Sequence, residues 1–534
     1  RMTGTEARPP APGGVPDGGT TGAGAHRIEA PTPAPVAAKP LGLPATRPED
    51  GEGLAQQTKR GLAWGGSSRL YGQLLQFAAS ILLARLLTPR DFGLAATVYL
   101  FAGVASVLTE MGIGSSIVRK RVLRQVDLAT AFWLSVFVGA ALALLLAALS
   151  PLIASWYDAP ELVVLMWLVA LRFVLAQYVV PLGLLERSMR FATIARIDVL
   201  AFTLGAVAAV AAALAGFGYY SLAMSPLVQS VVQTVLFGWA TRFVPRSFVD
   251  REAARELWAY SSSYTAANLV TYARTNADGL VVGRLLGQEQ LGYYGRGLAL
   301  VTLPLQQLNF VLRRVMLPTL TRLRDDPARL RAAYWSALGT IGLAVGTALA
   351  VLAACAQVLV PFIWGDQWTP AVPVIAWLAL AGTFQVLHAP TSWLCQLAGR
   401  NDLLLRLTLA SAALTVVALA IGIRGGIVGA AMALAAVGGL TLVPSLLLAA
   451  HLLDTRARSA VRRLVPGALS AAAAGGSAWA VGQAVEGLPA PVVLLVQGLV
   501  GLLAGAPAGL LADRLVRTGL LDAILTLLGR PRTA

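Results

Sequence analysis

Charged side chains are scarce in this chain. Asp, Glu, Lys and Arg make up 13% of its 534 residues, whereas hydrophobic residues make up 57%. Soluble globular domains carry about 25% charged residues. Apolar runs such as 140–149 and 412–421 are too long to face water. The composition therefore argues against a soluble protein and predicts an all-α, polytopic membrane protein.

Residues that form disulfides or bind metals are also few. The two cysteines, Cys355 and Cys395, lie in apolar segments, and the three histidines, His26, His388 and His451, are widely scattered. Neither set has the spacing of a disulfide framework or a metal site. No glycine-rich nucleotide-binding motif is present. We therefore expect no metal, no other cofactor and no use of ATP.

Lysine is rare, yet the chain is basic: 42 Lys and Arg against 26 Asp and Glu give a net charge of +16. In a soluble protein this excess would favour nucleic-acid binding. Here the basic residues lie in short loops between apolar segments, as the positive-inside rule predicts. No nucleic-acid partner is expected. We count fourteen apolar segments of membrane-spanning length: 61–87, 93–117, 128–151, 161–184, 195–216, 219–241, 258–286, 291–312, 334–360, 371–397, 403–422, 427–450, 464–484 and 490–512.

Alternate loops differ sharply in basic charge. One series, called here the base-poor loops, contains only Arg90 and Arg424, while the opposite loops contain clusters of arginine. This asymmetry predicts a multi-pass protein with both termini in the cytoplasm. The base-poor loops are 88–92, 151–160, 216–218, 287–290, 361–370, 423–426 and 485–489.

The first 56 residues form a separate segment. Ten of the 29 prolines fall between Pro9 and Pro48, and apolar residues are too sparse to offset the entropy of ordering. We predict a disordered cytoplasmic tail over 1–56. The predicted division of the rest is 57–242 for helices 1–6, 243–456 for helices 7–12, and 457–534 for helices 13 and 14 with the C-terminus.

An internal repeat relates helices 1–6 to helices 7–12. Segment 84–93 (ARLLTPRDFG) matches 283–292 (GRLLGQEQLG) at an offset of 199 residues. Segment 218–224 (GYYSLAM) echoes 426–432 (GIVGAAM) at an offset of 208. Because six helices separate the copies, both have the same orientation. Two parallel six-helix repeats, or lobes, typically enclose a substrate site between them.

These motifs also resemble a known family. The stretches 85–93, 110–114, 278–287 and 291–294 are similar to those of Wzx-type polysaccharide exporters in the multidrug/oligosaccharidyl-lipid/polysaccharide superfamily. The resemblance covers about residues 57–450. It implies a flippase for undecaprenyl-diphosphate-linked oligosaccharides, including lipopolysaccharide precursors, in the bacterial cytoplasmic membrane. Polysaccharide polymerases and glycosyltransferases are partner proteins that such an exporter could contact.

Polar residues inside the predicted spans are candidates for the substrate cavity, because lipid cannot satisfy their hydrogen bonds. Helix 1 and its repeat equivalent, helix 7, carry them at helical spacing, and arginine suits a diphosphate because its guanidinium offers a fork of donors. The alternative is structural bonding between helices. The candidates are Arg69, Gln73, Gln76, Asn268, Arg274 and Asp278.

Four other residues are weaker candidates: Glu110, Arg172, Arg296 and His388. For His388, bonding between helices is the favoured interpretation. Arg274 and Asp278 are four residues apart and can pair on one helix face. Arg85 and Arg284 lie near helix ends, where their side chains are expected to snorkel. Four prolines interrupt predicted helices: Pro181, Pro226, Pro304 and Pro444.

Other functions stay open at this stage. A cation-coupled drug antiporter on the same scaffold would need buried acids, whereas arginine predominates here. A flippase for peptidoglycan precursors would differ only in the sugar. A membrane glycosyltransferase or ligase would want paired carboxylates on a sizeable extramembrane face. The adjacent pair Asp325 and Asp326 is read as a solvated turn, so we expect no enzyme activity.

Overall fold

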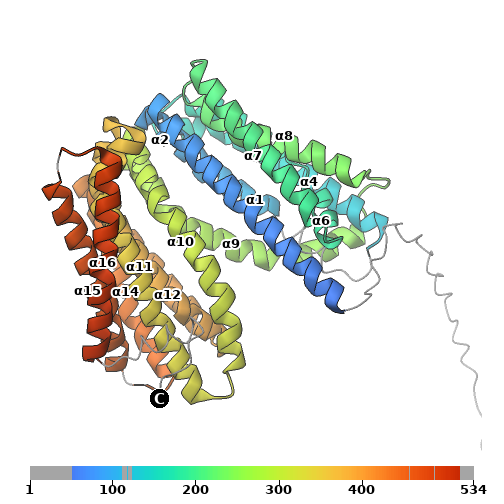
Figure 1. Ribbon diagram of the computed structural model, residues 1–534. Helices are drawn as coiled ribbons and strands as arrows, with labels where there is room; N and C mark the ends of the chain where they lie inside the picture. The colour runs from blue at the N-terminus through green and yellow to red at the C-terminus, as the bar shows by residue number, and fades with distance from the viewer. Residues whose placement is uncertain (1–50, 111–116, 118–122, 456, 486, 517–534) are drawn as a thin grey trace, which may run out of the picture. The chain divides into compact units, whose positions relative to one another are not determined.

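The regular elements of the computed structural model are all helices within the residues that it describes, 51–110, 117, 123–455, 457–485 and 487–516 (Figure 1). This confirms the predicted all-α class. The first helix set comprises α1 (Gly51–Leu86), α2 (Pro89–Glu110), α4 (Gln125–Trp156), α5 (Leu162–Leu175), α6 (Val179–Arg187), α7 (Phe191–Leu214) and α8 (Tyr220–Thr241). The second helix set comprises α9 (Arg251–Leu286), α10 (Gln288–Arg322), α11 (Pro327–Trp364), η1 (Asp366–Ala371), α12 (Val372–Leu397), α13 (Asn401–Gly422), η2 (Ile423–Gly425) and α14 (Gly426–Leu452). A final hairpin contains α15 (Ala457–Ala484) and α16 (Ala490–Val516).

Long apolar helices make this a multi-pass membrane protein. Among the described residues, nine helical stretches are long and apolar enough to cross a membrane, or ten if the bent pair α5 and α6 counts as one span. One stretch, Asn401–Leu452, includes both α13 and α14, which pack against each other. The total of fourteen crossings stays a prediction.

Two helix boundaries refine the sequence analysis. Helix α1 begins at Gly51, so the last residues of the predicted tail are helical, while residues 1–50 lie outside the described part of the chain. Helix α11 begins at Pro327, where the Asp326 side chain accepts a hydrogen bond from the Arg329 N–H at 3.0 Å. The acidic pair thus includes a helix N-cap in a turn, where short polar side chains satisfy the free N–H groups of the first turn.

The span predicted over 161–184 is two helices, α5 and α6, bent by 43°. Pro181 explains the break, because it has no N–H for the carbonyl of Gln177 and its ring crowds that carbonyl. Thr234 of α8 bonds two other backbone groups at the break. Its hydroxyl accepts from the Gln177 N–H at 3.1 Å and donates to the Leu175 carbonyl at 2.7 Å. The bend is therefore compatible with the membrane interior.

The pattern of neighbouring helices corresponds between the two sets. In the first set α4 packs on α5, α7 on α8, and α5 on α8. In the second set α11 packs on α12, α13 on α14, and α12 on α14. These are the pairs that the predicted repeat makes equivalent. Contacts of α2 with α10 and α9 join the two sets.

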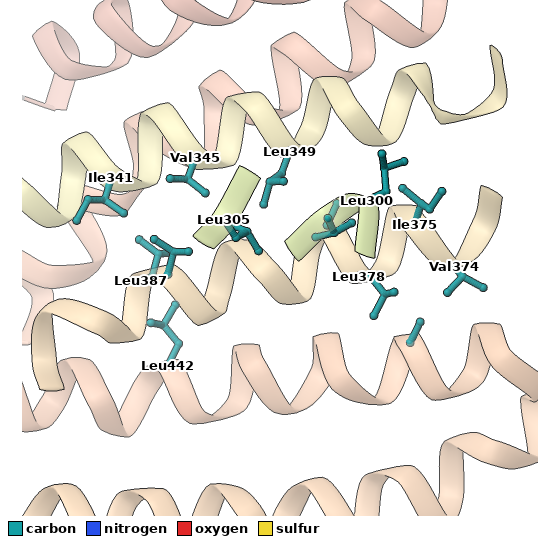
Figure 2. Packing of buried hydrophobic residues seen from close by; sticks show 14 of the residues in the cluster. Leu300, Leu305, Ile341, Val345, Leu349, Val374, Ile375, Leu378, Leu387 and Leu442 are labelled. Carbon is teal, nitrogen blue, oxygen red and sulfur yellow. The ribbon is translucent and has the colours of Figure 1, made fainter. Parts of the chain in front are cut away.

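Each set also has its own apolar core. In the first set, buried side chains of α2, α4 and α5 pack together, including Leu94, Leu146 and Leu165. In the second set, the core is formed mainly by α10, α11, α12 and α14; Figure 2 shows Leu305 of α10 close to Leu349 of α11 there. The second core also includes Ala84 of α1, so the two sets are in apolar contact near the end of that helix.

The α15–α16 hairpin packs on α11 of the second set (Figure 1). The contact is close because glycines face backbone: a Cβ on Gly467 would lie 2.8 Å from the carbonyl carbon of Gly342. Ser470 adds two buried hydrogen bonds, to the Thr347 hydroxyl at 2.7 Å and to the Gly505 carbonyl at 2.8 Å. Small residues and hydroxyls of this kind are how membrane helices associate.

Candidate functional site

Three long helices are unusually polar for a membrane protein. Helices α1 and α9 have 36 residues each and α10 has 35, yet over their described residues none of the three is apolar enough to be counted among the membrane-crossing stretches above. Polar side chains on all three account for this. In lipid such groups would have no partners, so these helices need protein or water around them.

The α1 candidates lie along one stretch of that helix. Gln73 is half-buried, and its Oε1 accepts a hydrogen bond from Nε2 of Gln307 in α10 at 2.7 Å. Arg69 and Gln76 are exposed. The stripe therefore combines one bond between the helix sets with two exposed side chains.

The α9 candidates divide into exposed and buried groups. Arg274 is exposed and Asn268 is half-buried, whereas Asp278 is 6% exposed. The Tyr294 hydroxyl in α10 donates to the Asp278 carboxylate at 2.6 Å. The expected pair of Arg274 with Asp278 is therefore wrong. The reason is that Asp278 turns into the α9–α10 contact, where a tyrosine one helix away supplies its bond.

His388 is a contact between helices rather than an open group. Its Nε2 lies 3.2 Å from the Thr441 hydroxyl and 3.3 Å from the Gly438 carbonyl, both in α14. This agrees with the structural interpretation favoured from the sequence.

The other weaker candidates have different surroundings. Arg172 of α5 donates to the Ser230 hydroxyl of α8 at 3.2 Å, so it bonds within the first set. Arg296 of α10 reaches the first set, where it donates to the Ser80 carbonyl of α1 at 2.6 Å. The side chain of Glu110 lies outside the part of the chain that the structure describes.

The repeat glycines Gly93 and Gly292 bring the two sets into backbone contact. A Cβ on Gly93 would stand 1.6 Å from the carbonyl oxygen of Gln288, and one on Gly292 would stand 1.9 Å from that of Pro89. Neither position has room for a side chain. Beside them the buried Thr97 hydroxyl donates to Oε1 of Gln288 at 2.7 Å. The starts of α2 and α10 thus lie against each other.

This contact extends along α2 toward the middle of α9. The Tyr272 hydroxyl donates to the Leu100 carbonyl at 2.9 Å. Gly103 makes room for it, since a Cβ there would lie 2.0 Å from that hydroxyl. Tyr272 was not among the residues predicted from the sequence. The only sequence feature that points to it is a glycine, Gly103, within an apolar helix.

Arg85 and Arg284 occupy equivalent positions in the repeat, and each contacts the other set. Arg85 at the end of α1 donates to the carbonyls of Phe362 and Ile363 at the end of α11, the latter at 3.1 Å. Arg284 at the end of α9 forms an ion pair with Asp158, just after α4, at 3.1 Å. Snorkelling to the interface stays a prediction, and each guanidinium is in addition bound by the opposite set.

These features define a helical membrane protein in which polar helices of two similar sets meet. The chain belongs to the polysaccharide biosynthesis protein family, whose sequence profile matches residues 82–373. This is the family type expected from the repeat motifs.

Two relatives and one solved structure illustrate the similarity. The chain is 27% identical over 381 residues to lipopolysaccharide biosynthesis protein WzxC of Escherichia coli (strain K12), covering 69% of this chain and 76% of that protein. It is 24% identical over 368 residues to teichuronic acid biosynthesis protein TuaB of Bacillus subtilis (strain 168), covering 66% and 73%. The fold is similar to lipid II flippase MurJ in an inward closed conformation, with a TM-score of 0.66, 12% identity and coverage of 84% and 98%.

Proposed function

We propose that this protein is a flippase for lipid-linked oligosaccharides in cell-surface polysaccharide biosynthesis. Family membership and the relatives named for lipopolysaccharide and teichuronic acid biosynthesis support the substrate class. The likeness to MurJ supports a fold suited to such transport. The proposed substrate is a glycan on undecaprenyl diphosphate, whose lipid tail stays in the membrane while the head group crosses.

The observation that carries this proposal is the charge of the exposed candidates. On α1 and α9 the exposed ionised candidates are Arg69 and Arg274, whereas the acidic candidate Asp278 is buried and bonded to Tyr294. Exposed guanidinium groups favour an anionic ligand such as a diphosphate. A site for cationic drugs would need the opposite arrangement. We place Arg69, Gln76 and Arg274 in contact with the head group and Gln73 and Asn268 beside them.

The proposed mechanism is alternating access between two lobes. We assign residues 57–242 to the N-lobe, 243–456 to the C-lobe, and 457–534 to the hairpin and C-terminus. The corresponding helix contacts within each set, and two apolar cores that each lie mainly in one set, support this division. Rocking of the lobes would expose the polar helices first to one side of the membrane and then to the other.

We further propose a bacterial cytoplasmic membrane location with both termini in the cytoplasm. The loop charges support this orientation. The base-poor loops then face outward. The protein acts in this scheme as a transporter rather than an enzyme, and a polysaccharide polymerase or glycosyltransferases would be its partner proteins.

The test is flipping of lipid-linked oligosaccharide in liposomes by Arg69→Ala. Loss of a charge-assisted contact worth about 1.5–3 kcal/mol should weaken head-group binding roughly tenfold to hundredfold. Arg69→Lys should restore transport only in part, because lysine keeps the charge but lacks the planar fork.

Arg90→Ala is the matched control. Arg90 is another arginine of the first set, but it pairs with Glu161 at 2.7 Å at a base-poor loop, so its loss should leave flipping unchanged. Full activity of Arg69→Ala at normal protein level would contradict the role of Arg69. Efflux of cationic drugs without any oligosaccharide flipping would favour the antiporter function instead.

A further inference from the structure

Arg296 lies in an aromatic cage formed by both helix sets. Its guanidinium carbon is 4.4 Å from the ring centre of Phe92 in α2, 4.7 Å from that of Trp364 in α11 and 5.6 Å from that of Trp368 in η1. One Nη donates to the Ser80 carbonyl of α1. Two of its contacts, Phe92 and Ser80, therefore belong to the first set, and two belong to its own.

The cage holds the cation without satisfying all of its donors. Nε of Arg296 is buried and has no hydrogen-bond partner. Burying an unpaired donor on a cation is unfavourable, and the faces of the surrounding rings offset part of that cost. Because the cost of the unpaired donor offsets part of the gain from the rings, the contact with the first set can break. Separation of the sets would return the guanidinium to water while two rings stay beside it.

Neighbouring bonds join the same segments. Nε1 of Trp368 and Nε2 of Gln367 both donate to the Ala84 carbonyl at 2.9 Å, near the end of α1. Phe92 and Trp368 also pack edge to face, with ring centres 5.3 Å apart. Arg296 thus sits beside a polar and aromatic contact between the base-poor ends of the sets.

We propose that Arg296 is a positioning residue for transport: it holds the base-poor ends of the two lobes together in this conformation. When these ends separate, Arg296 stays with Trp364 and Trp368 and gives up Phe92 and the Ser80 carbonyl. This role rests on the proposed flippase function, but it concerns the conformational step and not recognition of the glycan.

The experiment measures the distance between the base-poor ends directly. Nitroxide labels are placed at Phe217→Cys and Arg424→Cys, which lie in the equivalent exposed loops of the two sets. Both native cysteines are buried and are replaced by alanine. The full chain is studied in lipid nanodiscs without substrate, by pulsed electron paramagnetic resonance.

Arg296→Gln should increase the ratio of long to short distances about tenfold or more, because a bond from a charged donor and the cation–ring contacts are both lost. Arg296→Lys should give a smaller increase, since its charge can still lie over the rings. Phe92→Leu is the second variant, because it removes only the ring of the first set and leaves Arg296 in place. It should shift the distances in the same direction.

Arg90→Gln is the matched control, since its partner Glu161 lies in the same set. It should leave the distances unchanged. Folded Arg296→Gln and Phe92→Leu proteins with the parent distance distribution would overturn the proposal. If Arg296→Gln fails to fold, Arg296→Lys and Phe92→Leu decide together, because Phe92→Leu also removes the contact of Phe92 with Trp368. Because no substrate is present, a shift in distances without any flipping would support the role of Arg296 and count against the flippase function alone.

Discussion

At the scale of single residues, the candidates differ more in their surroundings than their shared helical spacing predicts. Arg274 and Asp278 lie one turn apart on α9, yet one is exposed and the other is buried against Tyr294. A charged residue in a membrane helix is a functional candidate by default, but a partner on a neighbouring helix can equally explain it. The roles of these two residues can therefore be separated.

Arg274→Ala should lower flipping without lowering stability, because Asp278 receives its hydrogen bond from Tyr294 and not from Arg274. Tyr294→Phe should destabilise the protein by about 1–3 kcal/mol, since the buried carboxylate loses that donor. Thermal unfolding in detergent distinguishes the two variants. An equal loss of stability in Arg274→Ala would show that Asp278 depends on the arginine after all.

At the scale of elements, the break between α5 and α6 shows how a membrane helix tolerates a bend. Pro181 removes a backbone hydrogen bond. The Thr234 hydroxyl of α8 forms hydrogen bonds with two backbone groups at the break, the Gln177 N–H and the Leu175 carbonyl. A side chain of one helix thus supplies hydrogen bonds to the backbone of another. The same arrangement fixes α8 against the bend.

Thr234→Val should lower the thermal stability by about 1–3 kcal/mol, because the Gln177 N–H and the Leu175 carbonyl would each lose the bond to the Thr234 hydroxyl and keep only their bond to each other, at 3.0 Å. Thr234→Ser keeps the hydroxyl and serves as the control. Unfolding followed in the same detergent provides the comparison. Equal stability of the valine and serine variants would mean that other groups satisfy the break.

How much of these elements the sequence can predict depends on the range of the interactions. Apolar length and loop charge are local properties, so the helical class and the bend near Pro181 could be predicted. The partners of Asp278 and Arg296 could not, because Tyr294 and Ser80 lie on other helices and helical spacing only defines a face. The partners of Arg85 and Arg284 could not be predicted for the same reason, since their acceptors lie in the opposite set.

At the scale of the whole molecule, several of the bonds between the sets lie near the base-poor loops, whereas the Gln73–Gln307 bond lies farther along α1 and α10. Arg85, Arg284 and Thr97 all bond the opposite set close to these loops. Tyr272 marks a contact nearer the middle of α9. In the proposed transport cycle, this arrangement corresponds to a state closed toward the outside.

The predicted topology determines from which side of the membrane each loop can be labelled. A cysteine introduced at Gly287 should react with an impermeant thiol reagent added to intact cells, whereas one at Ser459 should react only after the membrane is opened. The reason is that 287 lies in a base-poor loop and 459 lies among arginines. Labelling of both positions from the same side would refute the fourteen-crossing topology.

The glycine contact between α2 and α10 has a consequence for how such a chain can change over generations. Gly93 faces the backbone of one repeat motif, and Gly292 faces the backbone of the other. If the two halves arose by duplication, each copy has become part of the other's steric environment. A larger residue at Gly93 or Gly292 would clash with the backbone of the opposite motif. At this point the halves are therefore not free to diverge independently, however far the rest of their sequences drift apart.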